Sequence, residues 1–309
     1  MRKPLLFLLK IIISLAIFAF LFYRIASDKT SFSEALQGYH NNLPIILVVL
    51  LLMPLNWAME VFKWKLCISP LVKITFKQAI AGVLSGVALG FVTPRAVGDY
   101  FAKVWSIQHE DRKKALGPIL VARMSQMLPT LIFGIFSVKI FLDKSGSMLY
   151  FPTGYTPILI IVGGFLLLLL LIFLFFNYGK KKKHLIYYFD LIRELKLGIV
   201  VQLFGLSIVR YIVFSIQFLL LLSIFSFPLS LADQFMGISF MFLAKSVLPT
   251  FNVFNDLGVR EFSAVLYFEA FGVASAPIIL AGLILWLINI AVPALIGLFF
   301  IQRFRIDPS

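Results

Sequence analysis

The chain has 309 residues, of which 61% are apolar and only 14% charged, and its mean hydropathy is +0.99. This composition lies far outside the range of soluble globular domains, so a soluble fold is excluded. The net charge is +14, and the single cysteine, Cys67, excludes an intrachain disulfide. We therefore expect a membrane protein without thiol redox chemistry.

Six apolar runs are long enough to cross a hydrocarbon core, which takes roughly 20 residues of helix. They are Leu5–Tyr23, Leu43–Met59, Ala115–Leu142, Pro157–Phe176, Gly198–Phe225 and Pro277–Ile301. The first run follows two basic residues, as a signal peptide does. Because Lys10 splits it and no small-x-small cleavage site follows, we expect an uncleaved anchor.

Two further apolar segments, one in each half of the chain, are interrupted by proline, glycine and charged residues. The first runs from Ala81 to Lys103 and the second from Met241 to Gly272. Irregular backbone at membrane depth must line a cavity or be buried in protein. Paired interrupted segments are therefore the best sequence pointer to a binding site near the bilayer midplane.

The distribution of lysine and arginine predicts how these segments sit, because cytoplasmic loops are enriched in both. We expect a first hairpin, of about residues 78–106, that enters and leaves on the cytoplasmic side, because the basic stretch that follows then stays in the cytoplasm. The remaining spans then require a second hairpin, of about residues 234–274, to enter from outside. The N- and C-termini are expected to be cytoplasmic. Basic residues placed in this way indicate membrane orientation and no nucleic-acid partner.

The sequence thus predicts an all-α fold: a polytopic helical membrane protein of about six transmembrane helices plus two oppositely oriented re-entrant hairpins. Such opposed hairpins suggest an inverted repeat. We treat residues 1–309 as a single integral membrane domain.

The turns of the two hairpins are predicted from their breaker residues. In the first, Pro94 breaks the helix and Gly98 allows a tight turn into a helix that begins near Asp99. In the second, Pro249 breaks the helix and a new helix begins at Gly258. Three glycines at every fourth position leave one face of the first hairpin smooth, for close helix packing or, alternatively, for a lipid groove; they are Gly82, Gly86 and Gly90.

Charged residues also lie inside the long runs. Arg123 is about 12 Å along the third run and Arg210 about 18 Å along the fifth, at 1.5 Å per residue. Central ionisable groups cost about 2.5 to 3.5 kcal/mol on insertion scales, so they normally face a cavity or a partner. The candidates in runs and hairpins are Arg95, Lys103, Arg123, Arg210, Lys245 and Arg260 against Asp99, Asp256, Glu261 and Glu269.

These candidates carry an excess of two positive charges, which favours a ligand that bears phosphate. The alternative is internal salt bridging, for example Asp99 with Arg123 or Glu261 with Arg210. The histidines lie in separate loops, and the chain has no HExxH, Walker or nucleophile-elbow motif. We therefore expect no metal, no cofactor and no enzyme activity.

Two short motifs resemble those of the flippase-like family that includes the transmembrane region of lysylphosphatidylglycerol synthases. The first is like P-x-x-x-G-(E/D) followed by a basic residue, and here reads Pro94, Gly98, Asp99 and then Lys103, about one residue beyond the expected arginine. The second is like G-(L/V)-G-x-R-E and is matched by residues 256–261, with aspartate in place of the first glycine. The resemblance spans nearly the whole chain.

The resemblance implies a bacterial inner (plasma) membrane protein that moves or accommodates lipid headgroups. Some members are fused to a soluble aminoacyl-phospholipid synthase domain; we expect the membrane unit alone here, with a separate lipid-modifying enzyme as a possible partner. The oligomeric state stays open.

We expect a flippase-like translocator of an anionic or zwitterionic lipid, either a membrane phospholipid or a polyprenyl-phosphate lipid. The expected headgroup-binding residues are Arg95, Asp99, Arg123, Arg210, Arg260 and Glu261, with turns at Pro94, Gly98, Pro249 and Gly258. Two alternatives remain. One is a membrane-embedded transferase for polyprenyl-phosphate or phospholipid substrates with Asp99 or Glu261 as base; the other is a small-solute secondary transporter.

Overall fold

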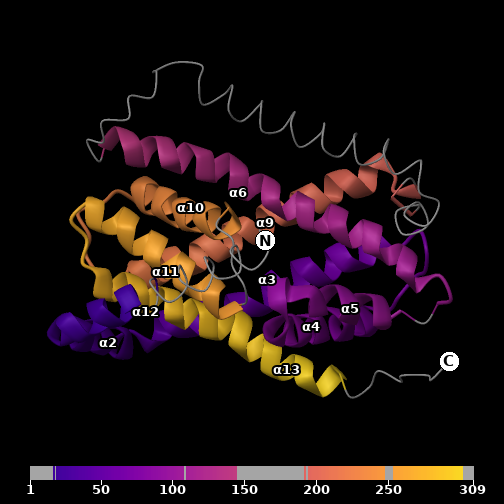
Figure 1. Ribbon diagram of the computed structural model, residues 1–309, viewed down its shortest axis with the longest axis horizontal. Helices are drawn as coiled ribbons and strands as arrows, with labels where there is room; N and C mark the ends of the chain where they lie inside the picture. The colour runs from indigo at the N-terminus through magenta and orange to yellow at the C-terminus, as the bar shows by residue number, and fades with distance from the viewer. Residues whose placement is uncertain are drawn as a thin grey trace, which may run out of the picture.

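The computed structural model describes residues 17, 19–107, 109–144, 191–192, 194–247 and 253–301, without the side chains of 95, 144 and 253–256. The predicted span Pro157–Phe176, most of Leu5–Tyr23, the predicted turn residue Pro249 and the C-terminus lie outside the described residues. Regular structure in the described part is entirely helical (Figure 1).

The α-helices, in chain order, are α2 (Lys29–Asn41), α3 (Leu43–Ile68), α4 (Phe76–Val92), α5 (Val97–Trp105), α6 (Leu116–Lys144), α9 (Leu197–Leu222), α10 (Leu231–Val247), α11 (Val253–Ala270), α12 (Ser275–Trp286) and α13 (Val292–Ile301). Short 3₁₀ turns, η1 (Pro94–Ala96) and η2 (Arg112–Ala115), precede α5 and α6. A π-helical turn, η3 (Leu287–Ala291), joins α12 to α13.

Within the described residues, four helical segments are long and apolar enough to span a membrane: Leu43–Ile68, Arg112–Asp143, Leu197–Leu222 and Ser275–Ile301. They coincide with four of the six predicted runs, and the protein is a polytopic helical membrane protein. The predicted end of the second run at Met59 is wrong. The helix continues to Ile68 because Glu60 and Lys63 are buried against charged and polar partners from other helices.

The first hairpin consists of α4 and α5, which pack along each other on either side of η1. Thr75 begins α4 with a capping box, and Thr93 Oγ1 accepts a hydrogen bond from Gly98 N at 2.8 Å in the turn. The helix after the turn begins at Val97, two residues before the predicted start, so Asp99 lies in its first turn.

Gly98 is required in this turn, but not for a left-handed backbone. The left-handed residue is Ala96, with φ of 52°. A Cβ on Gly98 would overlap the backbone carbonyl of Leu89 in α4, so Gly98 allows the two helices to approach. The smooth glycine face of α4 lies along the same segment, because a Cβ on Gly82 would meet Ser106, just after α5, and one on Gly90 would meet Ala96 in η1 and Asp99 in α5. The prediction of close packing is confirmed.

The second hairpin consists of α10 and α11, which also pack against each other. α11 begins at Val253, so the predicted helix start at Gly258 is wrong: this glycine is buried inside the helix. Asn and Asp before it favour turns in isolation, but packing against α10 and α12 overrides that local preference.

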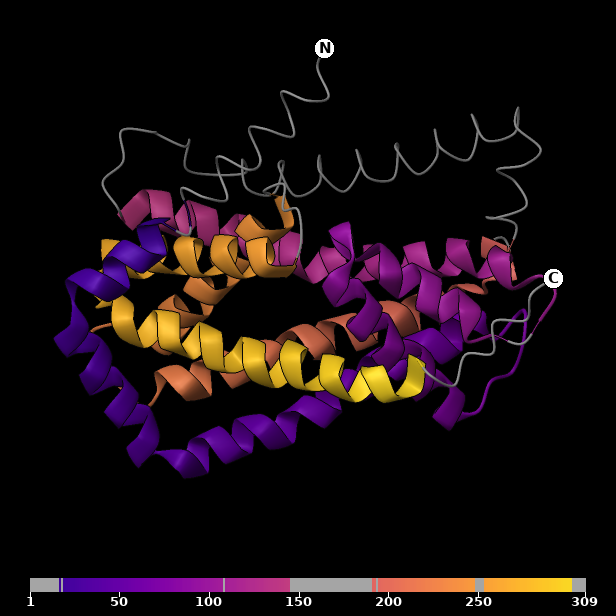
Figure 2. The ribbon, with the colours of Figure 1, turned by 60° about the horizontal axis from the view of Figure 1, so that its bottom comes forward.

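The two hairpins open at opposite ends of the bundle (Figures 1 and 2). The open end of α4 and α5 lies with the end of α3 and the starts of α6 and α9, whereas α10 and α11 open at the end where α2 meets α3. Their inner parts meet, because α11 contacts both η1 and α4. The last helical segment is divided between them: α12 packs against α11, and α13 packs along α4.

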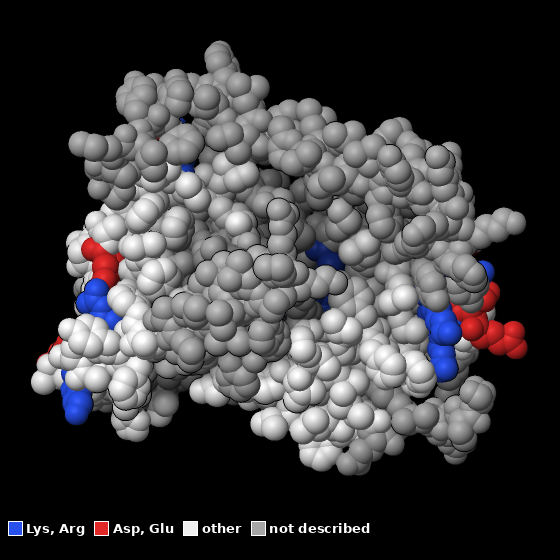
Figure 3. All heavy atoms as spheres, in the orientation of Figure 1, with Lys and Arg blue, Asp and Glu red and all other residues white. Residues whose placement is uncertain are grey.

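Charges on the face drawn in Figure 3 gather at the two ends of the long axis. Among the described atoms in the middle of that face, basic atoms lie in a hollow near its centre. The basic atoms at depth call for partners inside the bundle.

Candidate functional site

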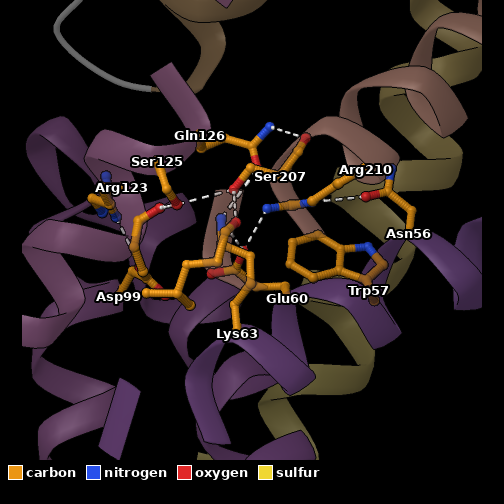
Figure 4. A network of polar contacts seen from close by, with 12 residues as sticks. Asn56, Trp57, Glu60, Lys63, Asp99, Arg123, Ser125, Gln126, Ser207 and Arg210 are labelled. Carbon is orange, nitrogen blue, oxygen red and sulfur yellow. Dashed lines mark hydrogen bonds and ion pairs between the residues drawn. The ribbon is translucent and has the colours of Figure 1, made fainter. Parts of the chain in front are cut away.

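Side chains from α3, α5, α6 and α9 form a connected network that we call the charged cluster (Figure 4). Its charged members are Glu60, Lys63, Asp99, Lys103, Arg123 and Arg210. Glu60 on α3 is the centre: its Oε2 accepts from Arg210 Nη1 at 2.6 Å and its Oε1 from Lys103 Nζ at 2.8 Å. Lys63 Nζ lies 3.7 Å from Glu60 Oε2. One carboxylate is thus shared by three cations.

Asp99 is the second carboxylate of the charged cluster. Its Oδ2 accepts from Arg123 Nη2 at 2.8 Å and from Lys103 Nζ at 3.2 Å. Asp99 and Lys103 are neighbours on α5 because residues four apart lie on one helical face. A Cβ on Gly86 of α4 would overlap the Asp99 carboxylate, so this glycine provides the space for it. Lys103 therefore links the two carboxylates.

Neutral side chains hold Arg210 and Lys63 in place. Asn56 Oδ1 accepts from Arg210 Nε at 2.8 Å, and the Arg210 guanidinium lies 5.1 Å from the centre of the Trp57 ring. Lys63 Nζ donates to Gln126 Oε1 at 3.2 Å. Together these contacts restrain two cations of the charged cluster, Arg210 and Lys63.

The π turn of the last helical segment contacts Asn56 and Trp57, two of these neutral side chains. Trp57 Nε1 donates to the backbone carbonyl of Asn289 at 3.2 Å, and Asn56 Nδ2 to Asn289 Oδ1 at 3.4 Å. Single π turns inside helices are frequent at functional sites because they free backbone groups for other partners. The charged cluster is thus connected to the junction between α12 and α13.

The charges of the cluster do not balance. Four cations face two carboxylates, so the described members carry a net charge of +2. The side chains of Lys63 and Lys103 are 1% and 6% exposed, whereas that of Arg123 is 39% exposed and rests over the Tyr100 ring at 4.2 Å. Uncompensated charge in a buried site is costly, so an excess of cations favours an anion. Arg123 is the most exposed of these charged members.

The structure brings three of the six predicted binding residues together: Asp99, Arg123 and Arg210. The alternative ion pair of Asp99 with Arg123 is confirmed. The alternative pair of Glu261 with Arg210 is wrong, because Arg210 on α9 reaches Glu60 on the adjacent α3. The backbone of Arg95 lies in η1, next to α11, and its side chain is outside the described residues.

Arg260 and Glu261 form a separate buried pair on α11. Arg260 donates to Glu261 Oε1 from Nη2 at 2.8 Å and from Nε at 3.1 Å, and to the Gly282 carbonyl at 2.6 Å. The two side chains are 4% and 1% exposed. Among the described residues, no hydrogen bond or ion pair joins them to the charged cluster. This pair balances its own charge and fastens α11 to α12.

Glu60 and Lys63 are the members of the charged cluster that sequence reasoning missed, since they follow the predicted end of the second run. A signal was available. Asn56, Glu60 and Lys63 recur at helical spacing on one face of an otherwise apolar helix, as residues that face polar partners do. Another predicted candidate, Glu269, instead pairs with Arg24 at 2.7 Å. The described side chains include no group of three or more His, Cys, Asp or Glu placed to hold a metal ion.

Comparison with protein-family models supplies one match. The family described as "Lysylphosphatidylglycerol synthase TM region" matches residues 7–297. The matched stretch includes both helical hairpins and every member of the charged cluster. Comparison with curated proteins and with solved structures gave no match.

Proposed function

The chain belongs to the lysylphosphatidylglycerol synthase transmembrane-region family, and we propose that it is a flippase-like translocator of phosphate-bearing lipids in the bacterial inner membrane. The charged cluster binds the headgroup phosphate. The lipid is a phospholipid or a polyprenyl-phosphate lipid, and a separate lipid-modifying enzyme is a possible partner.

The net charge of the charged cluster carries this proposal. If its cations served only to hold helices together, two carboxylates would need two cations. Two further cations raise the cost of burial, which a bound phosphate offsets. The side chain of Arg123 is 39% exposed and donates one of its five N–H groups to Asp99, so it has further donors for a ligand.

The depth of the charged cluster suits a headgroup that crosses the membrane. Glu60 is eight residues before the end of α3, about 12 Å along the helix, and Arg210 is thirteen residues after the start of α9, about 20 Å. The end of α3 and the start of α9 lie on the same side of the bundle, the side that the basic residues predict to be cytoplasmic. A headgroup bound here has left the interface and lies within the hydrocarbon region, roughly 30 Å thick.

In the proposed mechanism, the hairpins are re-entrant, enter from opposite sides, and move relative to each other as two halves of an inverted repeat. The last span links them, since α12 packs against α11 and α13 packs along α4. The π turn between α12 and α13 is the hinge, and Asn289 in that turn connects it to the cluster through Asn56. Phosphate binding is thereby coupled to hairpin movement.

Headgroup-sided translocation of labelled phospholipids in liposomes tests the proposal. The double variant Arg123→Gln/Arg210→Gln lowers the net charge of the described cluster to zero, and we expect translocation to fall to the rate of protein-free liposomes. The matched control is Lys139→Gln, which removes a cation whose nearest partner, Asp143 Oδ2, is 4.0 Å away at the exposed end of α6. Equal rates for the double variant and the unaltered protein would reject the proposal. Mass spectrometry of the lipids after the assay separates movement from chemical transfer.

A further inference from the structure

We propose that the charged cluster selects lipids whose headgroup ends in a phosphate monoester, which carries two negative charges, over phosphodiester lipids. The inference rests on the proposed function and names its substrate class. The chemistry is shared by phosphatidic acid and by polyprenyl monophosphates.

The charge count of the described cluster is the first reason. Both carboxylates already have partners: Glu60 has three cations and Asp99 has two. The excess of two positive charges is therefore distributed over one connected network and is not confined to a single loose side chain. All members except Arg123 have side chains no more than 16% exposed, so water screens them poorly.

Neutralisation of this excess distinguishes the lipid classes. A dianionic phosphate monoester brings the cluster to zero net charge. A monoanionic phosphodiester leaves the cluster with one uncompensated positive charge. A zwitterionic phosphodiester leaves two, and it also places its own cationic group beside the four cationic side chains. Since uncompensated buried charge opposes binding, discrimination comes from the headgroups that the site repels as well as from the one it attracts.

The available donors are the second reason. A phosphate monoester presents three terminal oxygens that accept hydrogen bonds, and it carries about −1.5 to −2 charges at pH 7. Arg123 uses one N–H group on Asp99, and Arg210 uses Nε on Asn56 and Nη1 on Glu60. Each guanidinium has five N–H groups, so both retain donors for additional oxygens.

Lys63 provides the decisive variant, because it contributes charge from the least exposed position. Its side chain is 1% exposed, and its Nζ contacts Gln126 Oε1 at 3.2 Å and Glu60 Oε2 at 3.7 Å. Lys63→Gln keeps a hydrogen-bonding side chain beside Gln126 and lowers the net charge of the cluster from +2 to +1. Lys63→Arg is the matched control, because it retains the charge.

The experiment measures binding of four lipids to the purified 309-residue chain by native mass spectrometry, with thermal stabilisation as a second readout. The lipids are phosphatidic acid, a polyprenyl monophosphate, phosphatidylglycerol and lysylphosphatidylglycerol. We expect at least one of the two monoesters to bind about tenfold more tightly than phosphatidylglycerol, the ratio that about 1.4 kcal/mol produces. Lysylphosphatidylglycerol, with a cationic headgroup part, should bind most weakly. The relative affinity of the two monoesters identifies the natural source of the phosphate.

In Lys63→Gln the preference for monoesters should disappear or reverse, and in Lys63→Arg it should persist. If Lys63→Gln does not fold, Arg123→Gln makes the same change of one charge at a half-exposed position and should shift the preference in the same direction. Equal binding of monoesters and diesters by the unaltered protein overturns the inference. The inference is also overturned if the preference for monoesters is unchanged in the variant that lacks one positive charge. The two proposals can fail separately. If the Arg123→Gln/Arg210→Gln double variant loses translocation but the unaltered protein binds monoesters and diesters equally, the proposed function stands and only the lipid class is wrong.

Discussion

Replacement of Glu60 by glutamine tests whether the charged cluster is held together through one carboxylate. Glu60 contacts Arg210 at 2.6 Å, Lys103 at 2.8 Å and Lys63 at 3.7 Å, and its side chain is 14% exposed. Glutamine keeps the shape and one oxygen acceptor but removes the negative charge. The described cluster then carries a net charge of +3.

The expected loss of stability follows from this environment. Removal of one partner from a buried ion pair costs about 3 to 5 kcal/mol, because the remaining charges stay buried without compensation. Asp99 still neutralises part of the cluster, so we expect the lower end, about 3 kcal/mol. At about 2 to 4 °C per kcal/mol for chains of this order of size, Tm should fall by roughly 6 to 12 °C.

The assay is thermal unfolding of the purified protein in detergent, with Glu269→Gln as the matched control. Glu269 pairs with Arg24 at 2.7 Å, and the two side chains are 29% and 38% exposed. Such an exposed pair contributes about 0.2 to 1 kcal/mol, so its loss should lower Tm only slightly. The double variant Glu60→Gln/Lys63→Gln restores the net charge of +2 and should recover part of the stability. Equal destabilisation by the two glutamate substitutions would refute the reasoning.

Three other experiments probe the rest of the fold. Gly282→Ala places a Cβ against the Glu261 carboxylate and should cost about 1 to 3 kcal/mol in thermal unfolding, whereas Gly205→Ala, which meets open space, should not destabilise. Asn289→Leu removes the hydrogen bond from Asn56 on α3 to the side chain of the π turn, and should slow translocation while lipid binding persists; parallel loss of both would contradict a hinge. Cysteines introduced as Glu110→Cys and Ser230→Cys should be labelled from opposite sides of the membrane, and labelling from one side would contradict the proposed topology.

Much of the fold could be predicted because spanning helices depend on local apolar length. The first hairpin is the clearest case: it was predicted at about residues 78–106, and its helices run from Phe76 to Trp105. The errors arise where tertiary contacts change a local preference. α3 continues past Met59 because other helices supply partners for Glu60, and Gly258 remains helical because α11 is packed on both sides.

The candidate site could be predicted less completely. Charges in apolar surroundings directed attention to Asp99, Arg123 and Arg210, but Glu60 was missed beside the predicted end of a span. The partners in the charged cluster are far apart in the chain: Arg210 and Glu60 are separated by 150 residues, and Lys103 and Glu60 by 43. Which cation pairs with which carboxylate therefore depends on how the helices pack, and this pairing cannot be predicted from the spacing of the residues along the chain.

By itself, the sequence determined that this is a helical membrane protein with two interrupted segments and more candidate cations than carboxylates in its apolar runs and hairpins. These properties depend on the apolar length and charge of each segment, which are local. Only the tertiary structure decided that the described cations and carboxylates of α3, α5, α6 and α9 share one cluster of net charge +2, while Arg260 and Glu261 neutralise each other on α11. The physical reason is that an ion pair forms across a few ångströms between packed helices, and packing alone sets those distances.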